Sequence, residues 1–155
     1  MESPLFHIAL LEPEIPQNTG NIGRLCLATG ARLHLIHPLG FQTDEKAVRR
    51  AGLDYWKQVD VVEHTDLAAF LEWAASRPIH ALSSHPGPVY TRIPHVPDGI
   101  YLFGRESKGL PRDLVARLGS YRIPMVGPTR SINLSNAAAV VAYAALEALR
   151  PDLYR

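Results

Sequence analysis

Short apolar runs alternate with helical stretches along the whole chain, and this alternation constrains the fold more than any other feature of the sequence. Each run is apolar or β-branched and is bounded by turn residues such as Gly, Pro or Asp, which is typical of buried strands. Strands that alternate with helices pair in parallel, because the helix supplies the crossover that a parallel connection needs. The sequence therefore predicts an α/β fold with a mostly parallel sheet covered by helices on both faces. The predicted strands are Phe6–Leu11, Leu33–Ile36, Val59–Val62, Ile79–Ser83, Ile100–Phe103 and Tyr121–Met125.

Helical spacing and capping signals predict four helices between and after these strands. In the first, Ile22, Leu25 and Cys26 recur on one helix face, where Cys26 is expected to pack, and Gly30 follows as the terminating residue. Caps and proline boundaries mark the ends of the others. The predicted helices are Asn18–Thr29, capped by Asn18 or Thr19; Asp66–Ala75, capped by Thr65; Pro111–Leu118; and a last helix, capped by Asn133 or Ser135, that ends at Arg150.

Length and composition exclude several classes of protein. The 155 residues contain no linker or composition shift, so we expect one domain over residues 1–155. The chain has no apolar run of the roughly 18 residues that cross a bilayer, and Met1–Pro4 lacks the charge of a signal peptide. A soluble, cytoplasmic protein without membrane association is expected. One cysteine, and seven histidines without ligand spacing, predict no disulfide and no metal site. Five of the histidines are expected in ordinary core or surface positions: His34, His37, His80, His85 and His95.

Positive charge is concentrated in the last third of the chain. Residues 1–100 carry eight Lys and Arg against eleven Asp and Glu, whereas residues 101–155 carry eight against four. Such a stretch can hold phosphate or can be an ordinary solvated surface, and charge alone leaves both interpretations open. The basic residues of this stretch are Arg105, Lys108, Arg112, Arg117, Arg122 and Arg130.

The segment after the first strand lacks the common nucleotide-binding motifs. It contains neither the GxGxxG of a dinucleotide site nor the GxxxxGK of a P-loop. Asn21 and Arg24 are three residues apart on the expected helix, so they share a face near its positive end, which suits a phosphate group or an ordinary solvated surface. Glu12 and Glu14 precede this helix without a second matched pair of carboxylates, and we interpret them as positioning the loop.

Three polar, glycine-containing loops occur late in the chain, at 104–111, 124–130 and 131–136. Ligands of open α/β sheets bind beyond the carboxyl ends of the strands, where these loops are expected to lie. We therefore predict that they share one pocket. Gly104 and Gly109 would let the backbone approach a ligand closely enough to contact an adenine edge.

These loops resemble the SPOUT superfamily of S-adenosylmethionine-dependent RNA methyltransferases, in particular its 2′-O-ribose branch. The residues that match the three family motifs are 18–24, 102–110, and 123–125 with 131–136. The smallest members, of the TrmL (YibK) type, methylate the wobble nucleotide of tRNA and are also similar at 12–16 and 49–55. With those segments, the resemblance covers almost the whole chain.

The resemblance implies a fold, a cofactor and an assembly. Family members are α/β-knot domains whose C-terminal segment forms a trefoil knot, and they act as homodimers that bind S-adenosylmethionine in the knot. Arg24 would be the catalytic arginine and would face the cofactor of the partner subunit. Arg105 stands where many relatives have proline, which leaves the shape of that loop open. By position, the cofactor-binding residues would be Leu82, Gly104, Gly109, Ile123, Ser131 and Leu134, and the site-shaping or RNA-binding residues Asn18, Asn21, Glu106, Ser135 and Asn136.

The last helix carries two further candidates. Ala138, Ala142 and Ala145 form a small-residue stripe that suits either the core or a dimer interface, and the resemblance favours the interface. Tyr143 lies on the neighbouring face, where it could contact RNA or the partner subunit.

The predicted function is methylation of the 2′-hydroxyl of tRNA nucleotide 34, a cytidine or modified uridine, without a metal. The alternatives are the same chemistry at another tRNA or rRNA position, a non-catalytic domain that binds RNA or S-adenosylmethionine, and a structural dimerisation module. A free guanidinium is a poor base at neutral pH, so Arg24 would act chiefly by binding a phosphate and stabilising negative charge on the 2′-oxygen.

Overall fold

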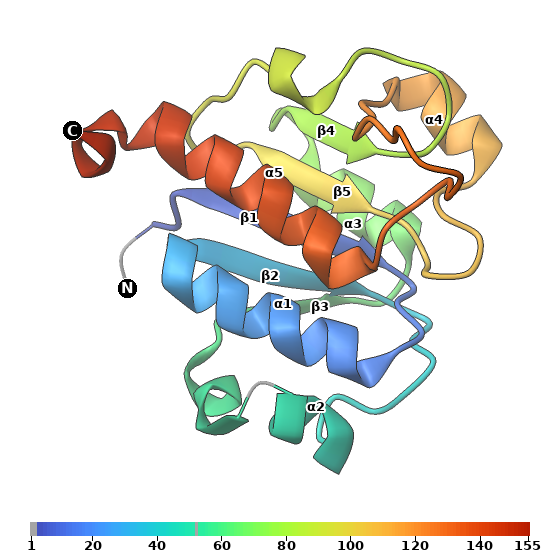
Figure 1. Cartoon of the computed structure of the whole chain (residues 1–155). Coiled ribbons are helices and arrows are strands. Elements are labelled where there is room, and N and C mark those ends of the chain that lie inside the picture. Colours follow the sequence, from blue (N-terminus) through green and yellow to red (C-terminus); the bar gives the residue numbers. More distant parts are fainter. Residues whose placement is uncertain (1–2, 52) are drawn as a thin grey trace.

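The computed structural model describes residues 3–51 and 53–155 and contains a five-stranded sheet in the order β3–β2–β1–β5–β4 (Figure 1). Every paired strand is parallel to its neighbour, as the alternating pattern predicts. The strands are β1 (Phe6–Leu11), β2 (Ala31–Ile36), β3 (Val61–His64), β4 (Ile79–Leu82) and β5 (Ile100–Phe103). The α-helices are α1 (Pro16–Thr29), α2 (Lys46–Ala51), α3 (Leu67–Ala74), α4 (Arg112–Leu118) and α5 (Leu134–Leu149).

Helices cover both faces of the sheet. Figure 1 shows α1 and α5 side by side in front of the sheet, with α3 behind it. The central strand β1 is buried over its whole length, and alternate side chains face opposite layers. Phe6, Ile8 and Leu10 pack in the cluster with α1 and α5, whereas Ala9 and Leu11 pack with α3 and α4. The carboxyl ends of the neighbouring strands β1, β5 and β4 therefore lie at the same edge of the sheet, between the two hydrophobic clusters.

The sixth predicted strand, Tyr121–Met125, is wrong. Tyr121 forms an isolated bridge with Leu82 at the end of β4, and Arg122 forms another with Val89. No regular strand is assigned to this segment. Pro124 lacks the N–H group that a continuing ladder requires, so pairing stops after two residues. The other five strands are present: β2 begins two residues before its predicted start, β3 lies two residues later than predicted, and β4 ends one residue earlier.

Two predicted helix caps are also wrong. Helix α1 begins at Pro16 after Ile15, so Asn18 and Thr19 lie inside the helix. Asp66, and not Thr65, caps α3 by accepting a hydrogen bond from the N–H of Ala69. The predicted Gly30 terminus of α1 and the Asn133 cap of α5 are confirmed. Helix α2 and the short 3-10 turns Leu53–Gln58, Tyr90–Arg92 and Pro151–Tyr154 were not predicted.

The small-residue stripe of α5 belongs to the core of the chain itself. Ala138, Ala142 and Ala145 are fully buried against the sheet layer, which corrects the expectation that this stripe is a dimer interface. Small side chains let α5 lie close to the neighbouring layer. Cys26 packs in the same cluster, as predicted, and burial raises the pKa of its thiol. The outer face of α5 instead exposes Tyr143.

No described helix has the length and apolar character needed to cross a bilayer. Two segments used in the sequence analysis lie partly outside the described residues. These are Met1–Pro4, through residues 1 and 2, and the family segment 49–55, through Gly52.

A row of three histidines crosses the sheet on the α3 side. His7 Nδ1 lies 2.8 Å from His34 Nε2, and His34 Nδ1 lies 3.0 Å from His64 Nε2. At the other end, His7 Nε2 lies 2.6 Å from a carboxylate oxygen of Asp98. All three imidazoles are buried beneath Trp73. The ordinary core role predicted for His34 is thus a hydrogen-bonded one.

This row makes stability depend on pH. Burial lowers the pKa of His34 to about 2 and also lowers those of His7 and His64. Below the ordinary histidine pKa of about 6.5, the unfolded chain binds more protons than the folded chain does. The free energy of unfolding is therefore highest above that pH and falls as the pH decreases. We expect urea denaturation to give a free energy of unfolding about 1 kcal/mol lower at pH 5.5 than at pH 7 from His34 alone. His34→Gln should flatten this dependence, whatever its overall stability, and an unchanged slope would contradict the assignment.

Candidate active site

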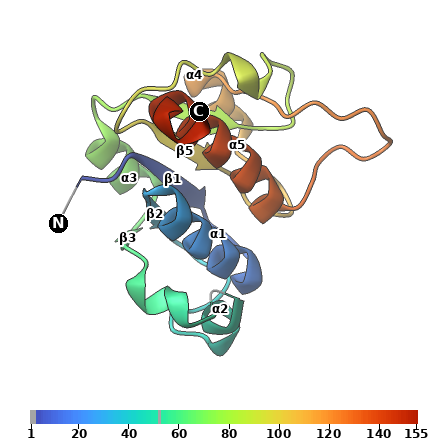
Figure 2. The ribbon, with the colours of Figure 1, turned by 60° about the vertical axis from the view of Figure 1, so that its left-hand side comes forward.

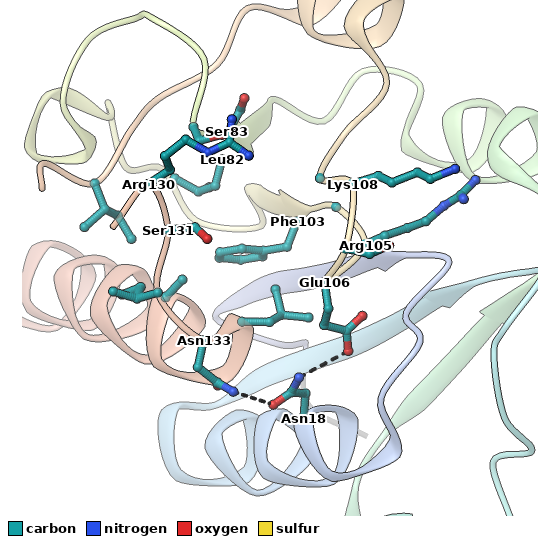
Figure 3. Close-up of a pocket in the computed structure, with 18 of the residues that line it drawn as sticks. Asn18, Leu82, Ser83, Phe103, Arg105, Glu106, Lys108, Arg130, Ser131 and Asn133 are labelled. Atoms are coloured by element: carbon teal, nitrogen blue, oxygen red, sulfur yellow. Dashed lines mark hydrogen bonds between the residues drawn. The ribbon is translucent and has the colours of Figure 1, made fainter. Parts of the chain in front are cut away.

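The predicted pocket is present at the carboxyl ends of β4 and β5 and encloses about 440 Å³ (Figure 3). Its walls come from the β4 end, from the loop 104–111 between β5 and α4, and from the segment 121–134 that leads into α5. That segment projects from the body of the protein in Figure 2. The structure brings together in this pocket all six residues that the family resemblance assigns to the cofactor: Leu82, Gly104, Gly109, Ile123, Ser131 and Leu134.

Gly104 is required by the close approach of two backbone segments. A Cβ atom added at this position would lie 2.1 Å from the carbonyl carbon of Gly109 and 2.3 Å from the amide nitrogen of Leu110. These are backbone atoms, which cannot move away as a flexible side chain can. Gly109 closes the same turn with φ +66° and exchanges hydrogen bonds with Arg105. The two glycines thus form a tight turn whose backbone faces the pocket.

A chain of side-chain hydrogen bonds connects the three motif segments (Figure 3). The amide nitrogen Nδ2 of Asn18 donates to Glu106 at 3.2 Å, and the Oδ1 of Asn18 accepts from Nδ2 of Asn133 at 3.1 Å. Asn18 lies in the first turn of α1 and is only 5% exposed. It therefore uses both ends of its amide to connect the loop after β5 with the start of α5.

Asn133 continues this chain into α5. Its Oδ1 accepts hydrogen bonds from the backbone N–H groups of Ser135 and Asn136 and from the hydroxyl of Ser135. These bonds satisfy the free N–H groups at the start of the helix. The expected site-shaping residues Ser135 and Asn136 therefore hold the third motif through Asn133, and they lie next to the pocket without lining it.

Two carboxylates join the loop after β1 to the loop after β5. Glu106 accepts hydrogen bonds from the backbone N–H groups of Glu14 and Ile15 at 2.8 and 2.9 Å. In return, Glu14 accepts from the N–H and the hydroxyl of Ser107 at 2.9 and 2.8 Å, and these bonds lower the pKa of the Glu14 carboxyl. The expected loop-positioning role of Glu14 thus has a defined geometry.

Arg105 does not offer a free charge to the pocket. Its guanidinium forms an ion pair with Glu12, with 2.6 Å between Nη2 and Oε1. In Figure 3, the side chains of Arg105 and Lys108 both point away from Phe103 and the interior of the pocket, whereas Arg130 bends toward Leu82. All three basic residues contribute to the pocket lining, and Arg130 is the one that lies near the β4 end.

Besides Ser135 and Asn136, three predicted site residues lie outside the pocket of their own chain. Asn21 and Arg24 are exposed on α1, and Tyr143 is exposed on α5. The guanidinium of Arg24 stacks over the ring of Tyr55, with its central carbon 5.0 Å from the ring centroid. The outer face of the α1–α5 layer thus presents an arginine and an aromatic side chain that contribute nothing to the cavity beside them.

Several residues that line the pocket carry no recognisable signal in the sequence. Ser84 and Tyr121 come from the segments joined by the isolated bridge at Leu82, and Ala137 comes from the first turn of α5. A pairing outside the regular strands leaves no periodic signal by which to identify such residues.

Within the described parts of the chain, no group of three or more His, Cys, Asp or Glu side chains is arranged to hold a metal ion.

The fold and the pocket define a protein of the SpoU class. The model of the SpoU rRNA methylase family matches residues 5–143, and the chain therefore belongs to that family. Among known proteins, it is 48% identical over 145 residues to tRNA (cytidine(34)-2′-O)-methyltransferase of Escherichia coli K12, a match that covers 91% of this chain and 92% of the relative. The enzyme of the same name from Saccharophagus degradans is also 48% identical, over 91% of this chain and 94% of the relative.

Solved structures are similar over nearly the same length. A structure concerned with 2-OH methylation of C/U34 on tRNA has a TM-score of 0.92 and 42% identity and covers 96% of this chain and 98% of its own. An AdoMet-bound rRNA methyltransferase from Sinorhizobium meliloti has a TM-score of 0.87 over 96% of this chain and 58% of its own, and at 24% identity it is similar in fold alone.

Asn18→Asp tests the hydrogen-bond chain. The substitution keeps the size of the side chain but places a second carboxylate against Glu106 in a buried position. The hydrogen bond to Glu106 is lost, and the two negative charges repel each other. We expect urea denaturation at pH 7 to show a loss of about 2–3 kcal/mol. Asn21→Asp, an exposed substitution on the same helix, should change the free energy of unfolding by less than about 0.5 kcal/mol. Equal effects of the two substitutions would rule out the bridging role of Asn18.

Proposed function

We propose that this protein transfers a methyl group from S-adenosylmethionine to the 2′-hydroxyl of nucleotide 34, the wobble nucleotide of tRNA. The observation that carries the proposal is the near full-length similarity to enzymes named for this reaction, with 48% identity to the Escherichia coli protein. The three motif segments that meet around one pocket support the same chemistry. The matches also cover most of both chains, 91% of this one and 92% and 94% of the two relatives.

The pocket fits S-adenosylmethionine in size and in lining. Its volume of about 440 Å³ is within the range of small-molecule sites, roughly 300–1,000 Å³. Leu82, Ile123 and Leu134 offer apolar surface for an adenine ring, and the backbone at Gly104 and Gly109 offers polar groups at its edge. When bound, S-adenosylmethionine supplies an electrophilic methyl group and leaves as a neutral thioether. The tight turn and the hydrogen-bond chain hold the pocket walls in place for it.

Arg24 is proposed to act on the ribose and not on the methyl donor. A guanidinium matches a phosphate through two parallel hydrogen bonds, and it stabilises negative charge that develops on the 2′-oxygen. Stacking on Tyr55 restricts the orientations of this long side chain before RNA binds. Tyr143 and Asn21 lie on the same outer layer, where they would contact RNA or the partner subunit.

The placement of Arg24 supports a homodimer. Arg24 is exposed outside its own pocket, so a second subunit is needed to bring it to a bound methyl donor. Exposed Leu27 lies one turn from Arg24, and Tyr143 is exposed on the neighbouring helix, which gives the outer α1–α5 face apolar surface for such a contact.

The trefoil knot and the cytoplasmic location stay predictions. The isolated bridges of Tyr121 and Arg122, on either side of the 83–88 loop, support the knot.

The reaction is tested with tRNA from cells that lack wobble ribose methylation. We expect incubation with S-adenosylmethionine, nuclease digestion and mass spectrometry to find a new 2′-O-methyl group at nucleotide 34. Arg24→Ala should reduce turnover by at least about a hundredfold because it removes a group that acts mainly in the transition state. Arg24→Lys should also be impaired, since an ammonium cannot form the bidentate contact. A methyl group at another nucleotide would change the substrate, and none on any RNA would refute the activity.

Mixed dimers test whether the active site is shared. Ser131→Trp fills the pocket from an exposed lining position, and Arg24→Ala removes the arginine, so each variant alone should be inactive. If each site combines the pocket of one subunit with Arg24 of the other, equal mixing after subunit exchange should restore about a quarter of wild-type activity. Sedimentation of the wild type should give a dimer at micromolar concentration. An inactive mixture of exchanged dimers, or a stable monomer, would contradict the shared site.

A further inference from the structure

The β1–α1 loop (residues 12–15) and the β5–α4 loop (residues 104–111) hold each other through reciprocal hydrogen bonds. Glu106 of the β5–α4 loop accepts from two backbone N–H groups of the β1–α1 loop, at Glu14 and Ile15. Glu14 of the β1–α1 loop accepts from the backbone and hydroxyl of Ser107 through one carboxylate oxygen. Each loop thus supplies a carboxylate that accepts hydrogen bonds from the other loop. The two carboxylates bind different groups: Glu106 binds the N–H groups of Glu14 and Ile15, and Glu14 binds Ser107.

The β1–α1 loop is fixed on its far side as well. The N–H of Gly40 donates to the carbonyl of Pro13 at 3.0 Å, and a Cβ atom at Gly40 would lie 3.0 Å from the Cα of Glu14. Glu12 has φ +52°, a backbone conformation that is unfavourable by about 1–2 kcal/mol for a residue other than glycine. Its side chain is paired with Arg105, which adds a contact to the β5–α4 loop and not to the far side. The loop is therefore anchored to the body of the protein and can serve as a fixed support.

The β5–α4 loop needs such a support. Ser107, Lys108 and Gly109 are exposed, and the turn is closed on itself by the hydrogen bonds between Arg105 and Gly109. Residues 104–109 all line the pocket, so any outward movement of this loop enlarges the cavity. Glu14 is the side chain that reaches from the fixed loop to Ser107 at the middle of this wall.

We propose that Glu14 is a positioning residue for methyl transfer: its carboxylate holds Ser107 and keeps the β5–α4 loop closed as a wall of the cofactor pocket. The proposal rests on the proposed function for its consequence in catalysis. Because the same loop holds the start of α1 through Glu106, Glu14 also keeps the pocket in a fixed relation to the helix that carries Arg24. The bonds join Glu14 to Ser107 of the β5–α4 loop of the same chain, so they act within one subunit.

Three variants separate this role from a general effect on stability. Glu14→Ala removes the acceptor, Glu14→Gln keeps one amide oxygen that can accept from Ser107, and Glu72→Ala removes an exposed carboxylate on α3 as a matched control. The measurements are the Kd of S-adenosylmethionine by calorimetry, KM and kcat with tRNA, the Tm, and amide hydrogen exchange of the full chain.

Glu14→Ala should raise the Kd and the KM of S-adenosylmethionine about tenfold while the Tm changes by less than about 4 °C, because the lost bonds are at the surface. Amide exchange should accelerate at Ser107 and also at Glu14 and Ile15, since the two loops separate together. Glu14→Gln should stay within about threefold of the wild-type Kd because its oxygen still accepts. Glu72→Ala should change none of these quantities.

Several results would overturn the proposal. An unchanged Kd in Glu14→Ala, an equal rise in Glu72→Ala, or a rise in Glu14→Gln as large as in Glu14→Ala would each do so. Faster exchange throughout the five strands would assign the residue to global stability instead. If the wild type binds S-adenosylmethionine but methylates no RNA, the proposed function fails while the comparison of Kd values still decides the role of Glu14. If it binds none, amide exchange in Glu14→Ala still decides whether the carboxylate holds the loop.

Discussion

The hydrogen-bond chain from Glu106 through Asn18 to Asn133 is the interaction on which the arrangement of the pocket depends. Its members are 88 and 115 residues apart in sequence, and each comes from a different motif segment. Asn18 can serve both neighbours because an amide has a donor on one atom and an acceptor on the other. Because Asn18 itself is buried, a hydrogen bond that its amide loses is poorly replaced by water. The three motifs are therefore one structural unit, although they are distant along the chain.

The sheet order makes this chain possible. Strand β5 pairs directly with β1, so the loops that follow the two strands leave the sheet as neighbours. The carboxylates of Glu14 and Glu106 can then cross from loop to loop over a short distance. Helix α5 lies beside α1 on the same face (Figure 1), which brings Asn133 to Asn18. Strand order, and not local sequence, thus determines which loops form the pocket.

Sequence patterns predicted the parallel sheet, five of its strands and the location of the pocket, because periodicity and turn residues are local signals. They failed where a long-range contact decided the outcome. Asn18 has the chemistry of a helix cap, yet its amide is used by Glu106 and Asn133, and the helix begins at Pro16. The alanine stripe of α5 has the same pattern in a core as in an interface, and only the position of the sheet decides between them. The pairing of Tyr121 with Leu82 has no periodic signal at all.

The buried histidine row has a fixed direction that follows from one end group. Asp98 can only accept, so Nε2 of His7 carries the proton, and its Nδ1 must accept from Nε2 of His34. The same reasoning assigns the proton of His64 to its Nε2. All three rings are then the same tautomer, and their dipoles point in one direction across three adjacent strands. An added proton can enter this row without breaking a hydrogen bond only at Nδ1 of His64.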